Sequence, residues 1–210
     1  MIKVFIADDH AIVREGLKQI VSEAADMLVA DEAGNGNEVL EKTLKGDFDV
    51  VILDITMPGI NGLDALKQIK CHRPELPILV LSMHPEEQYA SRVLKAGASG
   101  YLTKESAPEE LITSIRRVSK GMKYVSPSLA QRLVSELGID RDKALHEMLS
   151  DREYQVMCKL AAGKQVKQIA EELSLSVKTI STYRRRILEK MDMKSTAELV
   201  RYAMENDLSE

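Results

Sequence analysis

The chain has 210 residues, of which 44% are hydrophobic and 30% are charged, and its formal net charge at pH 7 is −4. This composition is typical of a globular chain that buries a core, and it excludes the fibrous and disordered classes of protein. No stretch approaches the length of a membrane span, and the first residues lack the apolar region of a signal peptide, so we expect a cytoplasmic protein with no membrane partner. The two cysteines, Cys71 and Cys158, lie far apart, which fits a reducing compartment.

Residues 1–120 alternate short apolar runs with amphipathic stretches. The apolar runs predict five strands, at Lys3–Ala7, Leu28–Ala33, Val50–Asp54, Ile78–Ser82 and Gly100–Leu102. The amphipathic stretches predict five helices, at Ala11–Ala24, Gly36–Lys45, Gly62–Arg73, Gln88–Ala96 and Pro108–Ser119. Strict alternation of strands and helices is typical of an α/β doubly wound parallel sheet with helices on both faces. Sites in such folds lie at the carboxyl ends of the strands.

Side chains that can carry chemistry stand at the ends of four of these strands. Asp8 and Asp9 follow the first strand, Asp54 ends the third, Ser82 ends the fourth, and Lys104 follows the fifth. Three carboxylates close together repel one another unless a cation joins them, and hard oxygen ligands suit Mg²⁺. A carboxylate there can attack phosphorus while the metal and a lysine neutralise the phosphoryl oxygens. Each residue alone is more often a turn or surface residue, but the set in this order predicts phosphoryl transfer to an aspartate.

Four motifs at these strand ends resemble those of receiver domains. They are Phe5-Ile-Ala-Asp-Asp-His10, Ile52-Leu-Asp-Ile-Thr-Met-Pro-Gly59, Val80-Leu-Ser82 and Gly97-Ala-Ser-Gly-Tyr-Leu-Thr-Lys104. The resemblance covers residues 1 to about 105 and implies a flavodoxin-like fold. It implies that Asp54 is the phosphoacceptor, that Asp8, Asp9, Asp54 and the Thr56 carbonyl hold Mg²⁺, that Ser82 and Lys104 sense the phosphoryl group, and that Tyr101 changes rotamer with them. One departure is that Glu105 follows Lys104, where many receivers have proline.

The rest of the chain reads as a linker followed by helices. Gly121, Pro127 and Gly138 interrupt the periodicity around a predicted short helix, Ser128–Leu137. Two segments, Ser150–Glu153 and Ser195–Glu198, have the capping-box form that begins a helix. We expect four helices here, at Asp151–Ala162, Val166–Leu173, Val177–Met191 and Thr196–Glu205.

The predicted helix Val177–Met191 is basic on one side and apolar on the other. Helical spacing puts Val177, Ile180, Ile187 and Met191 on one face, and the opposite face and its flanks carry Lys178, Ser181, Thr182, Arg185, Arg186 and Glu189. An apolar back with a cationic, hydroxyl-bearing front suits insertion into the major groove of DNA. Taken alone, the helix is more often an amphipathic helix with a solvated basic face. A short helix and the Ser174–Ser176 turn precede it, and this helix-turn-helix order favours a DNA-binding role for the basic helix.

Residues 148–208 closely resemble the LuxR-type DNA-binding domain. The resemblance is carried by Leu149-Ser-Asp-Arg-Glu-Tyr-Gln-Val156, Leu160–Gly163, Ile169–Leu173 and Val177-Lys-Thr-Ile-Ser-Thr-Tyr183. It implies that the side chains that contact DNA are Lys178, Ser181, Thr182 and Arg185. The last helix carries an apolar strip of Leu199, Val200 and Ala203, which the resemblance assigns to a dimer interface, and packing within the domain is an equal alternative for each of these residues.

Together the two halves resemble the NarL/FixJ class of two-component response regulators. The expected domains are a receiver at 1–120, a linker at 121–147 and a DNA-binding domain at 148–210. We hypothesise that a sensor histidine kinase phosphorylates Asp54 with Mg²⁺ and that the chain then dimerises on double-stranded DNA to regulate transcription. Such a chain is not an enzyme, although it assists its own phosphotransfer and dephosphorylation.

Two alternatives stay open at this stage. A phosphatase of the haloacid dehalogenase type also uses a strand-end aspartate, but it expects a second acid where this chain has Thr56. An interaction module with a degenerate receiver would bind protein through its helices and would show little dependence on salt. The four histidines lie apart without ligand spacing, so no zinc site is expected.

Overall fold

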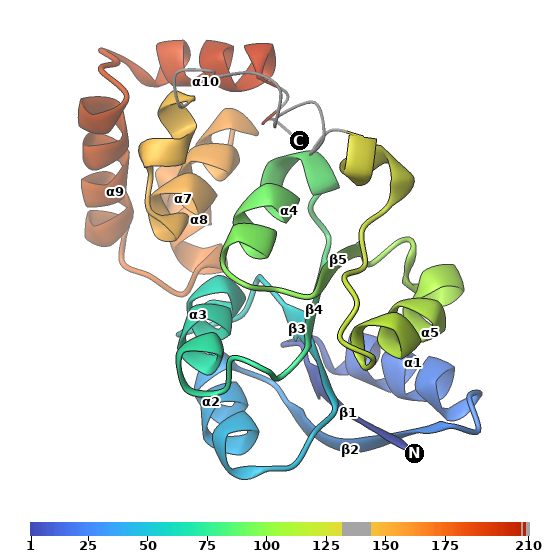
Figure 1. Ribbon diagram of the computed structural model, residues 1–210. Coiled ribbons are helices and arrows are strands. Elements are labelled where there is room, and N and C mark those ends of the chain that lie inside the picture. Colours follow the sequence, from blue (N-terminus) through green and yellow to red (C-terminus); the bar gives the residue numbers. More distant parts are fainter. Residues whose placement is uncertain (132–143, 207, 209–210) are drawn as a thin grey trace. The chain divides into compact units, whose positions relative to one another are not determined.

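The computed structural model describes residues 1–131, 144–206 and 208, and the chain divides into two units, Met1–Leu133 and Val134–Glu210 (Figure 1). In the first unit, strands and helices alternate along the chain. The strands are β1 (Ile2–Ala7), β2 (Met27–Ala33), β3 (Val50–Asp54), β4 (Ile78–Ser82) and β5 (Gly100–Thr103). The helices are α1 (Ala11–Ser22), α2 (Gly36–Lys45), α3 (Gly62–His72), α4 (Glu86–Lys95) and α5 (Ala107–Val118).

The five strands form one parallel sheet in the order β2-β1-β3-β4-β5. Every residue of β3 and β4 is buried, as expected for near-continuous apolar runs at the centre of a sheet that helices cover on both sides. In Figure 1, α1 and α5 cover one face and α2, α3 and α4 the other. The predicted fold class of this half is therefore confirmed, and the observed ends of its elements lie within two residues of those expected from the sequence.

The chain after α5 returns to the edge of the sheet. Tyr124 forms a parallel bridge with Gly100 of β5, and its backbone N–H donates to the Ser99 carbonyl at 2.8 Å. Residues 127–131 are helical. The helix predicted at Ser128–Leu137 therefore begins one residue earlier than expected, and its part from residue 132 lies outside the described residues.

The second unit is helical in its described part. After a 3₁₀ turn that the sequence patterns did not indicate, η1 (Leu145–Met148), it contains α7 (Asp151–Ala161), α8 (Val166–Glu172), α9 (Val177–Lys190) and α10 (Thr196–Glu205). The capping box predicted at the start of α7 is formed, because the Ser150 hydroxyl and the Glu153 carboxylate each accept from the other residue's backbone N–H. At α10 only half of it forms, since Ser195 accepts from the Glu198 amide while the Glu198 carboxylate accepts from the Lys194 amide.

None of the helices in the described ranges combines the length and the apolar character that a membrane span needs.

Candidate phosphoacceptor site and nucleic-acid interface

The register of the sheet aligns the strand-end residues on one rim. Ala7 pairs with Leu53, so Asp8 and Asp54 are the next residues on neighbouring strands. Ser82 pairs with Thr103, which places Lys104 one residue further on, and the Lys104 N–H donates to the Ser82 carbonyl at 2.8 Å. The predicted site therefore assembles at the carboxyl ends of β1, β3, β4 and β5, because the residues stand at matching register positions.

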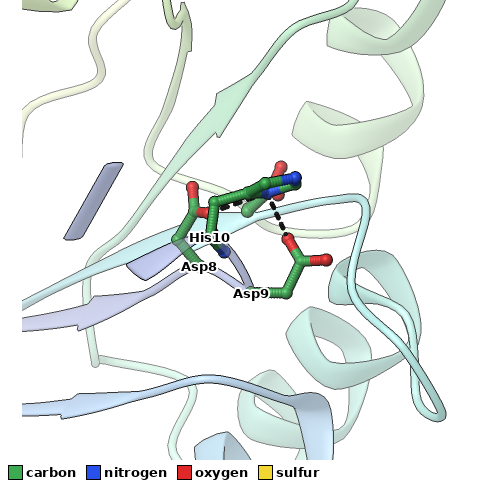
Figure 2. Close-up of side chains that lie close together, drawn as sticks. Asp8, Asp9 and His10 are labelled. Carbon is green, nitrogen blue, oxygen red and sulfur yellow. Dashed lines mark hydrogen bonds and ion pairs between the residues drawn. The ribbon is translucent and has the colours of Figure 1, made fainter. Parts of the chain in front are cut away.

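Three carboxylates and one imidazole gather at this rim. Asp8, Asp9, His10 and Asp54 each offer a potential ligand atom, and these atoms lie within 4.8 Å of one another. Figure 2 shows the His10 ring beside both carboxylates of the β1 end, with Nδ1 2.8 Å from Asp9 Oδ1 and 3.4 Å from Asp8 Oδ1. Asp8 and Asp54 are buried, whereas Asp9 is partly exposed and His10 is exposed. The cluster therefore opens to solvent on the side of Asp9 and His10.

Lys104 joins the two buried carboxylates. Its Nζ lies 2.6 Å from Asp8 Oδ2 and 3.1 Å from Asp54 Oδ2. Burial alone would lower the pKa of Lys104, but Asp54 and Asp8 raise that pKa above its ordinary value, so the ammonium stays charged. One cation thus faces three carboxylates, which leaves a negative site.

Burial raises the pKa of Asp54 to about 6, against the charge of Lys104 and with a smaller contribution from the charge of Asp8. At neutral pH the Asp54 carboxyl is therefore largely ionised. Its Oδ1 accepts from the Thr56 backbone N–H at 3.2 Å and its Oδ2 accepts from Lys104. The carboxylate is thus held from both sides, as a nucleophile must be. The Thr56 carbonyl has no contact in the structure that assigns it as a ligand, and that role stays a prediction.

Ser82 of β4 and Tyr101 of β5 both bond to His84, in the loop between β4 and α4. The Ser82 hydroxyl accepts from the His84 N–H at 3.1 Å, and the Tyr101 hydroxyl donates to the His84 carbonyl at 2.7 Å. Both side chains are fully buried. The two residues expected to respond to a phosphoryl group therefore hold the same residue of the loop. Glu105 stands where many receivers have proline, and the Lys104–Glu105 peptide is trans.

The site's chemistry fits Mg²⁺. Three carboxylates converge with one partly buried lysine as their counter-charge, and oxygen ligands of this kind are those that Mg²⁺ prefers. Among the described residues this is the single group of three or more acidic, histidine or cysteine side chains placed to hold a metal ion.

Two residues of this site were missed by the sequence patterns. His10 lies in the acidic cluster, and its signal was simply that it follows Asp8 and Asp9 directly. Arg14, one turn into α1, donates from Nη1 to the Asp8 carbonyl at 2.8 Å and lies 3.6 Å from Glu32. Arg14 thereby anchors the backbone of Asp8, a role that only the three-dimensional path of α1 reveals.

In the second unit, α8, a short turn and α9 form the predicted helix-turn-helix. Ile180, Ile187 and Met191 are buried, as their spacing predicted. Val177 departs from that prediction, since half of its side chain is exposed at the first turn of α9. The buried part of the apolar face of α9 therefore begins at Ile180.

The four predicted DNA contacts share the outer side of α9. Lys178, Ser181 and Arg185 are exposed and Thr182 is half-buried. The two hydroxyls donate to carbonyls one turn back, Ser181 to Val177 and Thr182 to Lys178. Each hydroxyl still has acceptor capacity, so this face presents two cations and two hydroxyl groups toward solvent.

Lys190 has a structural partner instead. Its Nζ lies 2.6 Å from Glu153 Oε2, and Glu153 is buried in α7. Although burial would raise the pKa of Glu153, hydrogen bonds from Lys190 and Ser150 hold that pKa below its ordinary value. Lys190 therefore neutralises a buried carboxylate, and the basic surface of α9 consists of Lys178 and the three arginines at 184–186.

The apolar strip of α10 divides into two parts. Leu199 and Ala203 have no exposed surface and belong to the core of the unit, where α10 packs on α7. Those two side chains are thus used within the domain and are not available to a second copy. Val200 is partly exposed and remains as the candidate contact.

Comparison with known protein families defines the class. Residues 4–116 match the response regulator receiver domain, and residues 147–203 match the LuxR family of bacterial regulatory proteins. The chain belongs to the response regulators that join a receiver domain to a LuxR-type helix-turn-helix domain, which confirms the NarL/FixJ-class resemblance.

Individual relatives match over nearly the whole chain. Response regulator UvrY of Escherichia coli K12 is 34% identical over 99% of this chain and 96% of its own length. Oxygen regulatory protein NreC of Staphylococcus carnosus is 38% identical over 98% of each chain. Among solved structures, RcsB of Salmonella enterica serovar Typhimurium, bound to promoter rprA in the presence of phosphomimetic BeF₃⁻, is 28% identical, with a TM-score of 0.66 over 97% of this chain and 99% of that one.

Proposed function

We propose that Asp54 accepts a phosphoryl group from the phosphohistidine of a sensor histidine kinase and that this modification controls DNA binding by residues 148–210. Residues 1–120 act as the receiver, and residues 121–147 connect the two parts in the cytoplasm. The observation that carries the proposal is the position of Asp54, a buried carboxylate that lies beside the Asp8–Asp9 pair on one rim of the sheet and shares the Lys104 ammonium with Asp8.

The chain's own residues prepare the transfer. An Asp54 carboxylate oxygen attacks phosphorus, the phosphorus–nitrogen bond of the donor breaks, and the donor imidazole leaves with the electron pair. Asp8, Asp9 and Asp54 would hold Mg²⁺, with the Thr56 carbonyl as a further ligand, and a bound Mg²⁺ supplies positive charge to the phosphoryl oxygens. Lys104 supplies a second positive charge, and the Thr56 N–H orients the carboxylate. Small donors of the acetyl phosphate type, which need no kinase, fit the same scheme.

The same groups serve the reverse process. Water that reaches the phosphorylated Asp54 through the open side of the cluster would hydrolyse it, so we propose that the chain assists its own dephosphorylation. The exposed face of α9, with Lys178, Ser181, Thr182 and Arg185, would enter the major groove of double-stranded DNA. A phosphorylated homodimer would read two half-sites, with Val200 of α10 as a contact between copies.

Phosphorylation is tested by incubating the protein with acetyl phosphate and Mg²⁺ and separating the products on a phosphate-binding gel. The natural chain should form one acid-labile phosphorylated species, and Asp54→Asn should form none. Asp47→Asn is the matched control, because Asp47 is an exposed acid of the same unit that pairs with Lys3 outside the site. If Asp54→Asn were phosphorylated at the natural rate, the assignment would be wrong.

DNA binding is tested by selecting duplexes from random fragments with and without the phosphoryl donor. We expect selected sequences whose affinity changes on phosphorylation and falls steeply with salt, because cations of α9 replace counterions on the phosphates. Sedimentation in the presence of the donor tests the dimer. Binding that selects no sequence or ignores salt would favour a protein-binding role for the helices.

A further inference from the structure

The first residues of the linker are bound to the receiver. Besides its bridge to Gly100, Tyr124 donates its hydroxyl to Glu110 of α5 at 2.8 Å. A side chain at position 100 would place its Cβ 2.6 Å from the Tyr124 carbonyl oxygen, so glycine is what lets this segment approach β5. The Lys123 ammonium donates to the Ala98 carbonyl at 2.5 Å. Lys123 and Tyr124, near the start of the linker, are therefore fixed to the receiver, and the direction of the outgoing chain is set by the residues that follow.

The next residues form a capped helix start. The Ser126 hydroxyl accepts from the Leu129 N–H at 3.1 Å, and the Ser126 carbonyl accepts from the Ala130 N–H at 2.9 Å. The Leu129 side chain is buried. This cap fixes where the helix at 127–131 begins and which way it points.

One carboxylate of the receiver reaches this helix start. Glu86, the first residue of α4, accepts through Oε2 from the Ser126 hydroxyl and, at 3.4 Å, from the Ser128 hydroxyl. The two serine hydroxyls also lie 2.9 Å apart. A charged acceptor makes stronger hydrogen bonds than a neutral one, so Glu86 is the side chain that links α4 to the outgoing helix.

Glu86 lies two residues after the point that the phosphorylation site controls. His84 is held at its N–H by Ser82 and at its carbonyl by Tyr101, and Pro85 connects it to Glu86. Turning the Ser82 hydroxyl toward a phosphoryl group on Asp54 would move the acceptor of the His84 N–H. Because Pro85 restricts the backbone in between, that displacement would pass through the loop to Glu86, the first residue of α4.

We propose that Glu86 is a positioning residue that couples the phosphorylation site to the linker through its hydrogen bonds with Ser126 and Ser128. This inference rests on the proposed function, since it takes Asp54 as the site of phosphorylation. It adds the element that passes the signal from the β4–α4 loop to the helix start at Pro127. The coupling would pass through a direct contact between the first residue of α4 and the cap of the outgoing helix.

The test measures DNA affinity of the full chain with and without acetyl phosphate. The probe is a fluorescent duplex that the natural chain has selected from random fragments, and the readout is the ratio of the two dissociation constants. Glu86→Ala should bring this ratio closer to one by about fivefold or more, while the rate and extent of phosphorylation stay unchanged. Glu109→Ala is the matched control, since Glu109 is also a glutamate in the first turn of a receiver helix, is exposed, and should leave the ratio unchanged.

A second pair of variants separates coupling from simple helix capping. Ser126→Asp keeps an oxygen that can cap the helix but puts a negative charge beside Glu86, so it should reduce the ratio as Glu86→Ala does. Adding Glu86→Gln to Ser126→Asp exchanges donor and acceptor and should restore the ratio. A purely structural role predicts no such rescue, and the extent of phosphorylation shows whether each variant still folds.

The outcomes distinguish this inference from the function on which it rests. If phosphorylation changes the DNA affinity of the natural chain and of Glu86→Ala equally, the coupling role is wrong and the proposed function stands. If Glu86→Ala does not fold, the Ser126→Asp variant and its rescue decide. If the natural chain takes up no phosphate, or its DNA affinity ignores phosphorylation, the proposed function itself fails.

Discussion

Asp54 combines a requirement for charge with a position that disfavours charge. A nucleophilic carboxylate must be ionised, yet Asp54 is 2% exposed and its pKa is raised to about 6. Lys104 offsets part of the desolvation at 3.1 Å, but it also serves Asp8 at 2.6 Å. The ionised Asp54 carboxylate therefore lowers the stability of the folded receiver at neutral pH. A bound cation, or a phosphoryl group with its metal, would offset this loss.

This leads to the first prediction, which concerns Asp54→Asn. The pKa of Asp54 is higher in the folded chain than its ordinary value of 3.8, so the folded state loses stability as the pH rises from about 4 to about 6. Replacing Asp54 by neutral Asn should raise the free energy of unfolding of the receiver at about pH 7.5, by up to roughly 3 kcal/mol. The gain should shrink toward zero near pH 4. Urea unfolding of the metal-free protein at both pH values measures it.

Asp47→Asn is the control for that experiment. Asp47 is exposed and its pKa is lowered by a hydrogen bond from Lys3, so its replacement should change stability little and in the opposite direction. An Asp54→Asn variant that is no more stable than the natural chain at about pH 7.5 would contradict the assigned penalty.

Gly62 shows how closely the backbone packs around the phosphoacceptor. A Cβ at this position would lie 1.9 Å from the Asp54 carbonyl oxygen, and the Gly62 N–H donates to the Ile55 carbonyl at 2.9 Å. Gly62→Ala must therefore push α3 away from the end of β3. We predict a loss of about 1–3 kcal/mol in stability together with slower phosphorylation by acetyl phosphate.

Gly16→Ala provides the contrast. Gly16 lies inside α1 with open space around the position of a Cβ, so alanine there should stabilise the chain by about 0.5–1 kcal/mol. Urea unfolding and the phosphorylation rate are compared for both variants. Equal effects of the two substitutions on phosphorylation would show that the close approach at Gly62 does not matter.

At the scale of residues, the sequence predicts the site where side-chain chemistry coincides with a strand end. The sequence predicted the proximity of Asp8, Asp54 and Lys104, because parallel strands end at a common rim. Arg14 could not, since its contact with the Asp8 carbonyl depends on how α1 crosses the sheet. His10 carried no ligand spacing with the other histidines, and its partners turned out to be the carboxylates beside it.

At the scale of elements, α9 carries two kinds of cation that the sequence does not separate. Arg185 is exposed and lies 3.8 Å from Glu189 in an exposed pair, whereas Lys190 holds the buried carboxylate of Glu153 at 2.6 Å. An exposed pair contributes little to stability, but a buried carboxylate without its partner is strongly unfavourable. Alanine substitution should therefore affect DNA affinity at Arg185 and folding stability at Lys190.

We predict that Arg185→Ala lowers DNA affinity by about 1–3 kcal/mol with little effect on folding. Lys190→Ala should instead destabilise the second unit by roughly 1–3 kcal/mol, because Glu153 loses its cation. Fluorescence anisotropy with a selected duplex measures the first effect, and urea unfolding the second. Combining Lys190→Ala with Glu153→Gln also removes the unpaired negative charge at position 153, so this double variant should recover part of the stability. Normal DNA affinity in Arg185→Ala would remove this arginine from the interface.

Helix positions follow from sequence more closely than helix contacts do. The capping serines at 150 and 195 placed the starts of α7 and α10 correctly, because a side chain that accepts from a local N–H is encoded within four residues. The Glu198 carboxylate nevertheless bonds Lys194 rather than Ser195. For Leu199 and Ala203 the sequence left core packing and a dimer interface as equal alternatives, since an apolar strip alone does not show which surface covers it.

At the scale of the whole molecule, charge is divided between the two parts. Residues 1–120 carry 14 basic and 19 acidic residues, whereas residues 151–210 carry 11 and 10. The receiver has five more acids than bases and repels DNA, so we expect DNA binding to depend on the local cations of α9 rather than on net charge. The alternation of strands and helices allowed the fold class to be predicted, while the Glu86 link to Ser126 joins residues 40 positions apart that no local pattern connects.

The last prediction separates the metal-dependent step from DNA binding. Within the ranges that the structure describes, the side chains placed to hold a metal all lie in the receiver, and the predicted DNA contacts all lie on α9. Removing Mg²⁺ with a chelator should therefore abolish phosphorylation by acetyl phosphate and any change in affinity that follows from it. The affinity of the unphosphorylated chain for a selected duplex should stay the same, measured by anisotropy at constant ionic strength because salt alone shifts DNA binding. Asp54→Asn with Mg²⁺ present should behave as the chelated natural chain does. A chelator that weakened DNA binding by this variant as well would place a metal requirement in the DNA-binding part and contradict the division of roles.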